Sequence, residues 1–478
     1  MLSTKNAPKR WIYGIAGLLL YLAFAFLLPV PEVMEQSAAA ADYSGRMAMG
    51  VLGSIILAIC WWAGDVFPNW IVSLSMQVIW VLFRYTNVSG AFHSYTNSTI
   101  WLYMALFCIA AAVNKTGLLR RIALELMKLF STSFRGQVMA LMISGVICSP
   151  LIPSAAAKIV LGSMLALNIA DAMGYEKDSP GRYGLFIAAI IGYGMVCPAF
   201  ISAGTNSYAM LSVLPEEVQV QATYVTWLVA MLPWLIIEVA GMTLFIFWYY
   251  GKETKAVVSS EYVAEELRKM GRVSKDEKIV FAILAVCLFF WIFESLIHVD
   301  STAVALVGAI ICFLSGILEN KEIATAPPWH LIIFVGGAIN IGYMLSVSGL
   351  NAWFQHILMP VFGLIGNKYT LVLIIALSII VIRFFIVSLT ATITLTLSIL
   401  VPILDSLGIG SLGVGLIIYA SMLCWFVPYQ NLVLIPGLNS MNGTIQHRGT
   451  VPACFAYEAL SLIAFFISIP LWDKMQIL

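Results

Sequence analysis

Residues 136–173 form an apolar stretch whose centre carries groups suited to binding a small anion. From Ser149 to Lys158 the chain reads Ser-Pro-Leu-Ile-Pro-Ser-Ala-Ala-Ala-Lys. The two prolines break a first helical arm, and Ser154 is a favourable N-cap for a second arm. N–H groups at a helix start lack partners and attract negative charge, and the alanines leave them accessible. The sequence therefore predicts an anion site made by Ser154, Ala155, Ala156 and Lys158.

Basic residues flank both ends of this stretch, so we expect it to enter the membrane from the cytoplasm and return as a re-entrant hairpin. Non-helical backbone at that depth is tolerated where it lines a cavity. The alternative is a kinked hairpin that only packs, with the Lys158 side chain extended to an interface. A lysine at mid-membrane without a partner costs about 2.5 kcal/mol or more, which favours the site.

Residues 370–405 are the expected inverted partner of this hairpin, entering from outside. The tip residues assigned to the site are Ser388, Leu389, Thr390 and Thr392. The alternative for the three hydroxyls is that they bond to carbonyl groups of their own helix. Two interpretations of Arg383 stay open: it binds an anion, or it pairs with a membrane acid such as Glu238 or Glu294.

Two further apolar spans are interrupted by polar residues. Span 183–212 contains Cys197-Pro198 and then Gly204-Thr205-Asn206, and span 411–436 contains Pro428 and Asn431. Proline and glycine free backbone carbonyls, and an asparagine amide can reach a substrate or a cation. We therefore add Thr205, Asn206 and Asn431 to the predicted site; an ordinary proline kink is the alternative for each span.

The composition requires a membrane. Of 478 residues, 61% are apolar and 10% are charged, with a net charge of +1. No soluble fold of this length could cover so much apolar surface, so lipid must cover part of it. Disorder, a disulfide-rich secreted module and nucleic-acid binding by bulk charge are excluded. Eight scattered cysteines indicate small core residues.

We expect an all-α integral membrane protein with about eleven transmembrane helices plus the two re-entrant hairpins. A span needs about 20 residues. The expected spans are 11–31, 47–66, 67–84, 99–115, 183–212, 224–250, 278–297, 301–318, 329–349, 411–436 and 452–472. A cleavable signal peptide is the alternative for the first span, although its apolar run is long for one.

The placement of lysine and arginine predicts the orientation. Basic residues gather in 115–135 and 252–278, while 31–45 and 213–223 carry only acidic charges. The positive-inside rule then puts the N-terminus in the cytoplasm and the C-terminus outside an inner (cytoplasmic) membrane.

The two halves of the chain share landmarks at nearly constant offsets of 225 to 234 residues. The matched positions are Trp62 with Trp291, Asp65 with Glu294, Thr116-Gly117-Leu118 with Ser348-Gly349-Leu350, Ser154 with Ser388, and Asn206 with Asn431. Each copy has five full spans, so the second must be inverted, as in secondary transporters. The expected units are 1–46 (N-terminal helix and outer loop), 47–250 (first repeat), 251–277 (cytoplasmic amphipathic linker) and 278–478 (second repeat).

At these residues the chain resembles the divalent anion/sodium symporter family, particularly its citrate, tartrate/succinate and 2-oxoglutarate/malate exchanger-like members. The likeness covers about residues 47–470. The motifs that carry it are Trp61-Trp62-Ala63-Gly64-Asp65, Asp300-Ser301-Thr302-Ala303-Val304-Ala305-Leu306, Phe384 to Thr392, and Pro428-x-x-Asn431.

The resemblance implies a homodimer with a scaffold and a moving transport domain, working by an elevator-type alternating-access mechanism. It also implies two Ser-Asn-Thr-like tips that hold carboxylates, with candidate sodium positions near Ser149, Ser154, Gly204, Ser388 and Pro428. The first tip here lacks Asn and Thr. Lys158 stands where exchanger-like members carry a basic residue, Thr392 where some carry His, and Leu389 replaces the middle polar residue of the second tip.

We therefore expect a secondary active transporter of small di- or tricarboxylate-like anions that exchanges anions or depends weakly on sodium. A fixed Lys158 charge would replace a bound cation. The alternatives are a sodium-coupled symporter of carboxylate, sulfonate or sulfate, and an anion channel. No metalloprotease or Walker motif indicates an enzyme. Sodium is the one candidate cofactor, and the expected partners are a small organic anion, lipid and a second copy, without nucleic acid.

Overall fold

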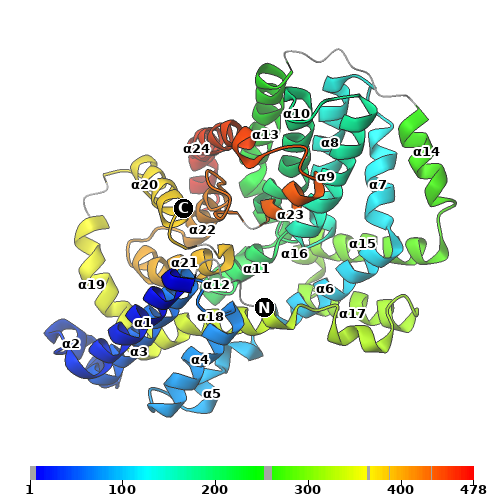
Figure 1. Ribbon diagram of the computed structural model, residues 1–478. Helices are drawn as coiled ribbons and strands as arrows, with labels where there is room; N and C mark the ends of the chain where they lie inside the picture. Colours follow the sequence, from blue (N-terminus) through cyan, green and yellow to red (C-terminus); the bar gives the residue numbers. More distant parts are fainter. Residues whose placement is uncertain (1–6, 252–260, 363–365, 387, 432) are drawn as a thin grey trace.

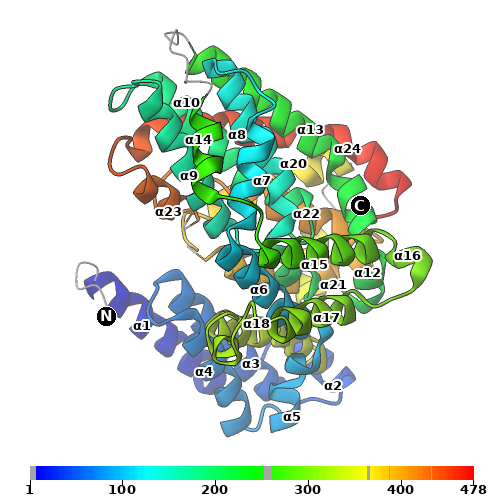
Figure 2. The same cartoon turned by 90° about the vertical axis from the view of Figure 1, so that its right-hand side faces the viewer.

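The computed structural model describes residues 7–251, 261–362, 366–386, 388–431 and 433–478. Within these ranges the chain forms helices and no strand, as expected for a chain that must satisfy its backbone hydrogen bonds in lipid. Two bodies are visible in both views (Figures 1 and 2): the N-terminal helices gather with α18 in the lower part, and α8, α10, α13 and α24 gather in the upper part.

The lower body contains the helices of the first spans together with part of the second half. Its helices are α1 (Ala7–Leu22), α2 (Glu32–Ala40), α3 (Gly45–Ala63), α4 (Asn69–Leu82), α5 (Val88–Ala91), α6 (Ser98–Thr116), α17 (Ser301–Leu314), α18 (Trp329–Val347) and α19 (Leu350–Phe362). Helix α1 packs on α3, α4 on α18, and α6 on α17. Segments from both halves of the sequence therefore share this body.

The upper body holds the broken and re-entrant segments. Its helices are α8 (Phe134–Cys148), α9 (Ala155–Ala172), α10 (Pro180–Ile190), α11 (Thr205–Leu211), α12 (Glu216–Gln221), α13 (Tyr224–Tyr249), α20 (Lys368–Ile382), α21 (Leu389–Ser406), α22 (Ser411–Ser421), α23 (Leu434–Ser440) and α24 (Val451–Lys474). Helix α13 packs along α24, and α9 packs against α8, α10 and α23. Helix α21 reaches the lower body and packs on α18 and α19.

Eight described helices are long and apolar enough to cross a membrane, or nine if one bent pair counts as a single span. Six of them coincide with expected spans: 11–31, 47–66, 183–212, 224–250, 329–349 and 452–472. Two more are the arms of the expected hairpin 136–173. The helices α4, α17 and α22 have only 11 to 14 residues, because loops or breaks interrupt the apolar runs. The count of eleven stays a prediction.

The junction at Gly117 bends the chain by 64° between α6 and α7 (Leu118–Met127). Gly117 has φ +74°, a left-handed conformation that favours glycine. Gly349 has the same φ between α18 and α19. Both glycines belong to landmarks matched between the two halves of the sequence, so the matched residues build the same local turn.

The expected linker 251–277 is described from residue 261 onward, since residues 252–260 lie outside the described residues. Helix α14 (Glu261–Met270) packs beside α7 (Figure 2), and α15 (Lys275–Ile292) follows. Arg121 in α7 donates to Glu277 Oε1 at 2.7 Å and also to the carbonyls of Gly271 and Met270. Ser274 and Glu277 form a capping box at the start of α15. The short helix α16 (Glu294–Ile297) leads to α17.

The Arg121–Glu277 pair is the most enclosed ion pair of the described residues, with side chains 10% and 3% exposed. Burial alone would raise the pKa of the Glu277 carboxyl, but hydrogen bonds from Arg121 and Ser274 hold the pKa below its usual range. A depressed carboxyl pKa stabilises the fold above the unfolded pKa, and this contribution is lost as the pH falls through the folded pKa.

Replacing Glu277 by Gln should destabilise the protein by roughly 3 kcal/mol, because it leaves a buried guanidinium without its counter-charge. Thermal unfolding in detergent measures the effect. The matched control is Glu125→Gln, whose pair with Lys128 is exposed on both sides and should change stability by less than about 1 kcal/mol. Equal shifts in the two variants would contradict a structural role for the Arg121–Glu277 pair.

Candidate functional site

The first tip has the expected broken geometry. Helix α8 ends at Cys148, a short 3-10 turn covers Ser149–Leu151, and α9 begins at Ala155. Ser154 caps α9, and its Oγ accepts from the Ala157 N–H at 3.3 Å. The described structure gives no hydrogen-bond partner to the N–H groups of Ala155 and Ala156, which start the helix. These two groups are the donors available to an anion.

Lys158 points back into the break and is fully buried. Its ammonium donates to the carbonyl oxygens of Ser149 at 2.6 Å and Ala203 at 2.7 Å. It also contacts Ser149 Oγ at 3.2 Å and Cys197 Sγ at 3.5 Å. No carboxylate of the described residues lies within ion-pair distance of Lys158, so the dipoles of two broken backbones stabilise its charge.

The second tip repeats this arrangement with arginine. Helix α20 ends at Ile382 with Arg383 as its C-cap, and Ser388 caps α21 by accepting from the Ala391 N–H at 3.2 Å. Arg383 is fully buried and donates to the carbonyls of Met422 and Ile386. The expected pairing of Arg383 with Glu238 or Glu294 is wrong, because its guanidinium donates instead to these two backbone carbonyls and to Thr392 Oγ1 at 3.2 Å.

The three hydroxyl groups of the second tip differ in their hydrogen-bond partners. Thr392 Oγ1 donates to the Ser388 carbonyl at 2.9 Å, so it bonds within its own helix. Thr390 Oγ1 instead donates to Asn206 Oδ1 at 2.8 Å, across to α11. Ser388 Oγ additionally accepts from Asn69 Nδ2 at 3.4 Å, a contact with the lower body.

In spans 183–212 and 411–436 the helix is interrupted at the predicted polar residues. Helix α10 continues as a π-helix (Ile191–Met195) and a 3-10 turn (Cys197–Ala199) before α11. Between α22 and α23, Asn431 donates to the Leu423 carbonyl at 2.7 Å and accepts from the Val433 N–H at 3.1 Å. The Asn431 amide thus holds the backbone of the break.

The two tips and the two breaks enclose one cavity of about 270 Å³. Predicted site residues that line it are Ser154, Ala155, Ala156, Thr205, Asn206, Leu389 and Asn431. Lys158, Ser388, Thr390 and Thr392 lie outside the lining. Of the candidate sodium positions, Ser154 and Gly204 line the cavity, while Ser149 binds the Lys158 ammonium and Ser388 and Pro428 are not in the lining.

The apolar and aromatic wall of this cavity was not expected from the sequence. That wall contains Phe107, Met195, Leu331, Tyr419 and Leu423. No local signal distinguishes these residues from ordinary apolar residues of a span. The described residues of the lining include no Asp or Glu. The volume of the cavity is below the roughly 300–1,000 Å³ of sites for drug-sized ligands. The cavity therefore suits a small anion.

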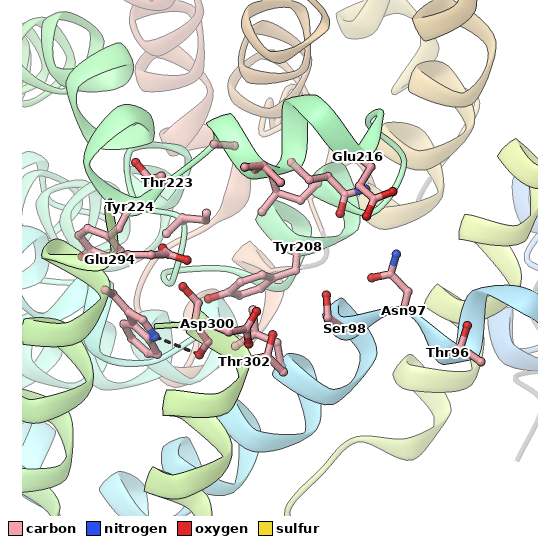
Figure 3. A pocket seen from close by; sticks show the side chains of 18 residues that line it. Thr96, Asn97, Ser98, Tyr208, Glu216, Thr223, Tyr224, Glu294, Asp300 and Thr302 are labelled. Carbon is pink, nitrogen blue, oxygen red and sulfur yellow. Dashed lines mark hydrogen bonds between the residues drawn. The ribbon is translucent and has the colours of Figure 1, made fainter. Parts of the chain in front are cut away.

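A larger cavity of about 610 Å³ lies at the starts of α6, α13 and α17, beside α12 and α16. Figure 3 shows Glu294, Tyr224 and Thr223 on one side and Ser98, Asn97 and Thr96 on the other. Three carboxylates line it, those of Glu216, Glu294 and Asp300. Acidic walls repel anions, so size alone does not make this cavity the anion site.

The family model described as "Sodium:sulfate symporter transmembrane region" matches residues 9–433. The chain belongs to this family. The resemblance to divalent anion/sodium symporters is thereby confirmed. The family and its relatives are transporters, so this chain is a multi-pass membrane transporter and not an enzyme.

Curated relatives are similar over most of their length. A putative malate transporter of Bacillus subtilis is 22% identical, covering 74% of each chain. The L-tartrate/succinate antiporter of Escherichia coli is 25% identical, covering 81% of this chain and 82% of its own. The crystal structure of the YdaH transporter of Alcanivorax borkumensis shares the fold, with a TM-score of 0.53 and 14% identity, covering 80% of this chain and 86% of that one.

Replacing Asn206 by Ala removes the acceptor of Thr390 and a polar group of the 270 Å³ cavity. We expect about fivefold weaker anion binding, since one hydrogen bond is worth about 1 kcal/mol and a tenfold change needs about 1.4 kcal/mol. Thermal stabilisation by a series of small organic anions, titrated in detergent, measures it. The control is Asn168→Ala, on α9 outside the lining. Equal anion affinity in both variants would exclude Asn206 from the site.

Proposed function

We propose that this protein moves small di- or tricarboxylate-like anions across the cytoplasmic membrane by alternating access, exchanging anions or depending weakly on sodium. The observation that carries the proposal is the convergence of two serine-capped helix N-termini on one cavity without acidic residues. Two N-terminal dipoles suit an elongated ligand with a negative group at each end. The malate and tartrate/succinate transporters among the relatives have names that agree with this ligand class.

Anion exchange is favoured over sodium symport by the position of Lys158. Its ammonium takes the carbonyls of Ser149 and Ala203, which are oxygen ligands that a sodium ion in this break would need. A built-in positive charge at the same place stabilises the anion without a bound cation. The sodium-coupled symporter remains the second candidate because of the family to which the chain belongs.

An inverted repeat and an elevator movement belong to the proposal. Trp62 donates to the carbonyl of Asn69, the first residue of α4, and Trp291 donates to that of Ser301, the first residue of α17. The same bond at matched positions supports two copies of one unit. We propose that the lower body is the scaffold of a homodimer and that the upper body moves with the anion.

The cytoplasmic N-terminus and outer C-terminus also stay part of the proposal. In this orientation the start of α18 is cytoplasmic, and Pro328 and Leu331 there line the 270 Å³ cavity. The acidic 610 Å³ cavity lies on the outer side. The structure then corresponds to a state in which the anion site is near the cytoplasm.

Purified protein in liposomes loaded with unlabelled malate should take up labelled malate in a saturable way, equally in sodium and choline buffers. Internal malate should accelerate the uptake, because a carrier returns faster when loaded. A channel would show no acceleration by internal anion. Uptake that requires sodium would replace exchange by symport, and saturable sulfate uptake without malate uptake would change the substrate class.

Replacing Lys158 by Ala should make malate transport sodium-dependent, because the emptied break exposes carbonyl oxygens that can hold a cation. Malate uptake without sodium should fall at least about tenfold, a loss of about 1.4 kcal/mol. Lys177→Ala, an exposed lysine after α9, is the control. Unchanged uptake kinetics of Lys158→Ala in choline buffer would remove Lys158 from the mechanism.

A further inference from the structure

Two glutamates lie together between α13 and α24, away from both cavities. Glu238 in α13 is fully buried, and Glu458 in α24 is 5% exposed. Neither residue lines the anion cavity or the acidic cavity. The proposed anion transport gives them no role, although carboxyl groups inside a membrane are expensive and usually functional.

The hydrogen bond from Ser461 shows that the carboxyl groups of Glu238 and Glu458 are neighbours. Its Oγ donates to Glu238 Oε1 at 2.6 Å and accepts from Trp234 Nε1 at 3.0 Å. Ser461 follows Glu458 by three residues on α24, so the two side chains are neighbours on one helix face. Glu238 therefore reaches the same face of α24 that carries Glu458.

The pair has no positive partner. Glu238 Oε2 and Glu458 Oε1 are buried without a hydrogen bond in the described structure. No lysine, arginine or histidine of the described ranges lies within ion-pair distance of either carboxyl group. The other titratable groups around the pair are Tyr457 and Cys454 of α24 and Cys424 of the break after α22. Arg383 lies beyond Cys424, with its guanidinium bound to backbone carbonyls.

Such a pair binds a proton for a simple physical reason. Two neighbouring carboxylates that are both ionised in a low-dielectric site repel each other and lose their hydration. A proton on one oxygen removes one charge and supplies a donor for an oxygen that lacks a partner. A sodium ion would need several more oxygen ligands than the two unpaired ones here.

The pair is connected to the anion site through α24. Tyr457, next to Glu458, donates to the carbonyl of Met195 at 3.2 Å. Met195 ends the π-helix of the broken span and lines the anion cavity. Two residues later, Cys197 accepts from the Lys158 ammonium. A change in charge at the pair is thus transmitted to the segment that holds Lys158 by one hydrogen bond.

We propose that Glu238 and Glu458 form a proton-binding site that couples anion movement to the proton gradient. The proton adds to a carboxylate oxygen from one aqueous side and leaves the same oxygen at the other side, and no other covalent bond changes. The bound proton offsets one negative charge of the transported anion. This inference rests on the proposed anion transport, and it adds a proton-driven net uptake to the proposed anion exchange.

Liposomes without internal anion test the coupling. Malate accumulation is measured at constant external pH, with the internal pH raised by one unit and the membrane potential clamped. One coupled proton should raise the accumulation ratio about tenfold per pH unit. The Glu238→Gln and Glu458→Gln variants should keep malate counterflow at equal pH on both sides and lose this stimulation. Glu319→Gln, an exposed glutamate in a surface ion pair, is the control and should keep it.

A direct measurement of the proton does not depend on transport. The infrared carbonyl band of protonated carboxyl groups should be present in detergent-solubilised wild type at neutral pH and should shrink in the Glu238→Gln/Glu458→Gln double variant. An unchanged band overturns the proton site, even if the variants are unstable in liposomes. Malate accumulation that is insensitive to the pH gradient overturns the coupling and leaves anion transport standing, whereas wild type without any counterflow overturns the proposed transport itself.

Discussion

Backbone polar groups at the breaks of membrane helices need partners, and this need organises the molecule. Lipid supplies no hydrogen bonds, so each interrupted helix must satisfy its freed carbonyls from within the protein. Lys158 does this at the first tip and Arg383 at the second. The Trp227 indole does it at Pro198, and the Asn431 amide does it at Leu423. The breaks persist because these side chains stabilise them.

The need to satisfy freed carbonyls also keeps the charged side chains of the two tips out of the cavity lining. Lys158 and Arg383 hold carbonyls behind the cavity and do not line it, so the groups left for an anion are helix N–H donors and small polar side chains. Their positive charges still act across a short distance in a low dielectric. For the proposed transport, such a site would attract an anion and let it leave, because no side-chain cation of the described lining would form a direct ion pair with it. Acidic residues gather instead in the 610 Å³ cavity.

Matched residues in the two halves of the chain perform matched local tasks. Gly117 and Gly349 both turn the chain with φ +74°, and Ser154 and Ser388 both cap a helix that starts inside the bundle. The two halves differ in the cation that holds the tip and in the asparagines: Asn206 bonds to Thr390 of the opposite hairpin, while Asn431 bonds to its own break.

The sequence by itself determined the features that depend on neighbouring residues. Prolines and a capping serine act within a few residues, so the break at 149–154 was predictable. The segment 383–388 contains no Gly or Pro, so its break was expected only from the match with the first hairpin, and the bend at Gly117 was not expected. The membrane class followed from composition alone. Nothing in the local pattern, however, says whether the ammonium of Lys158 points into a cavity or back into its own break.

Only the tertiary structure decided which distant groups meet. The Thr390–Asn206 bond, the Arg383–Met422 bond and the neighbourhood of Glu238 and Glu458 join segments that are 39 to 223 residues apart. Side-chain direction in an apolar helix carries little periodic signal when most faces are buried, as in α10, whose residues after Pro180 are all buried. Packing of one helix on another therefore selects these contacts, and it also places an unpaired carboxyl group beside a second one.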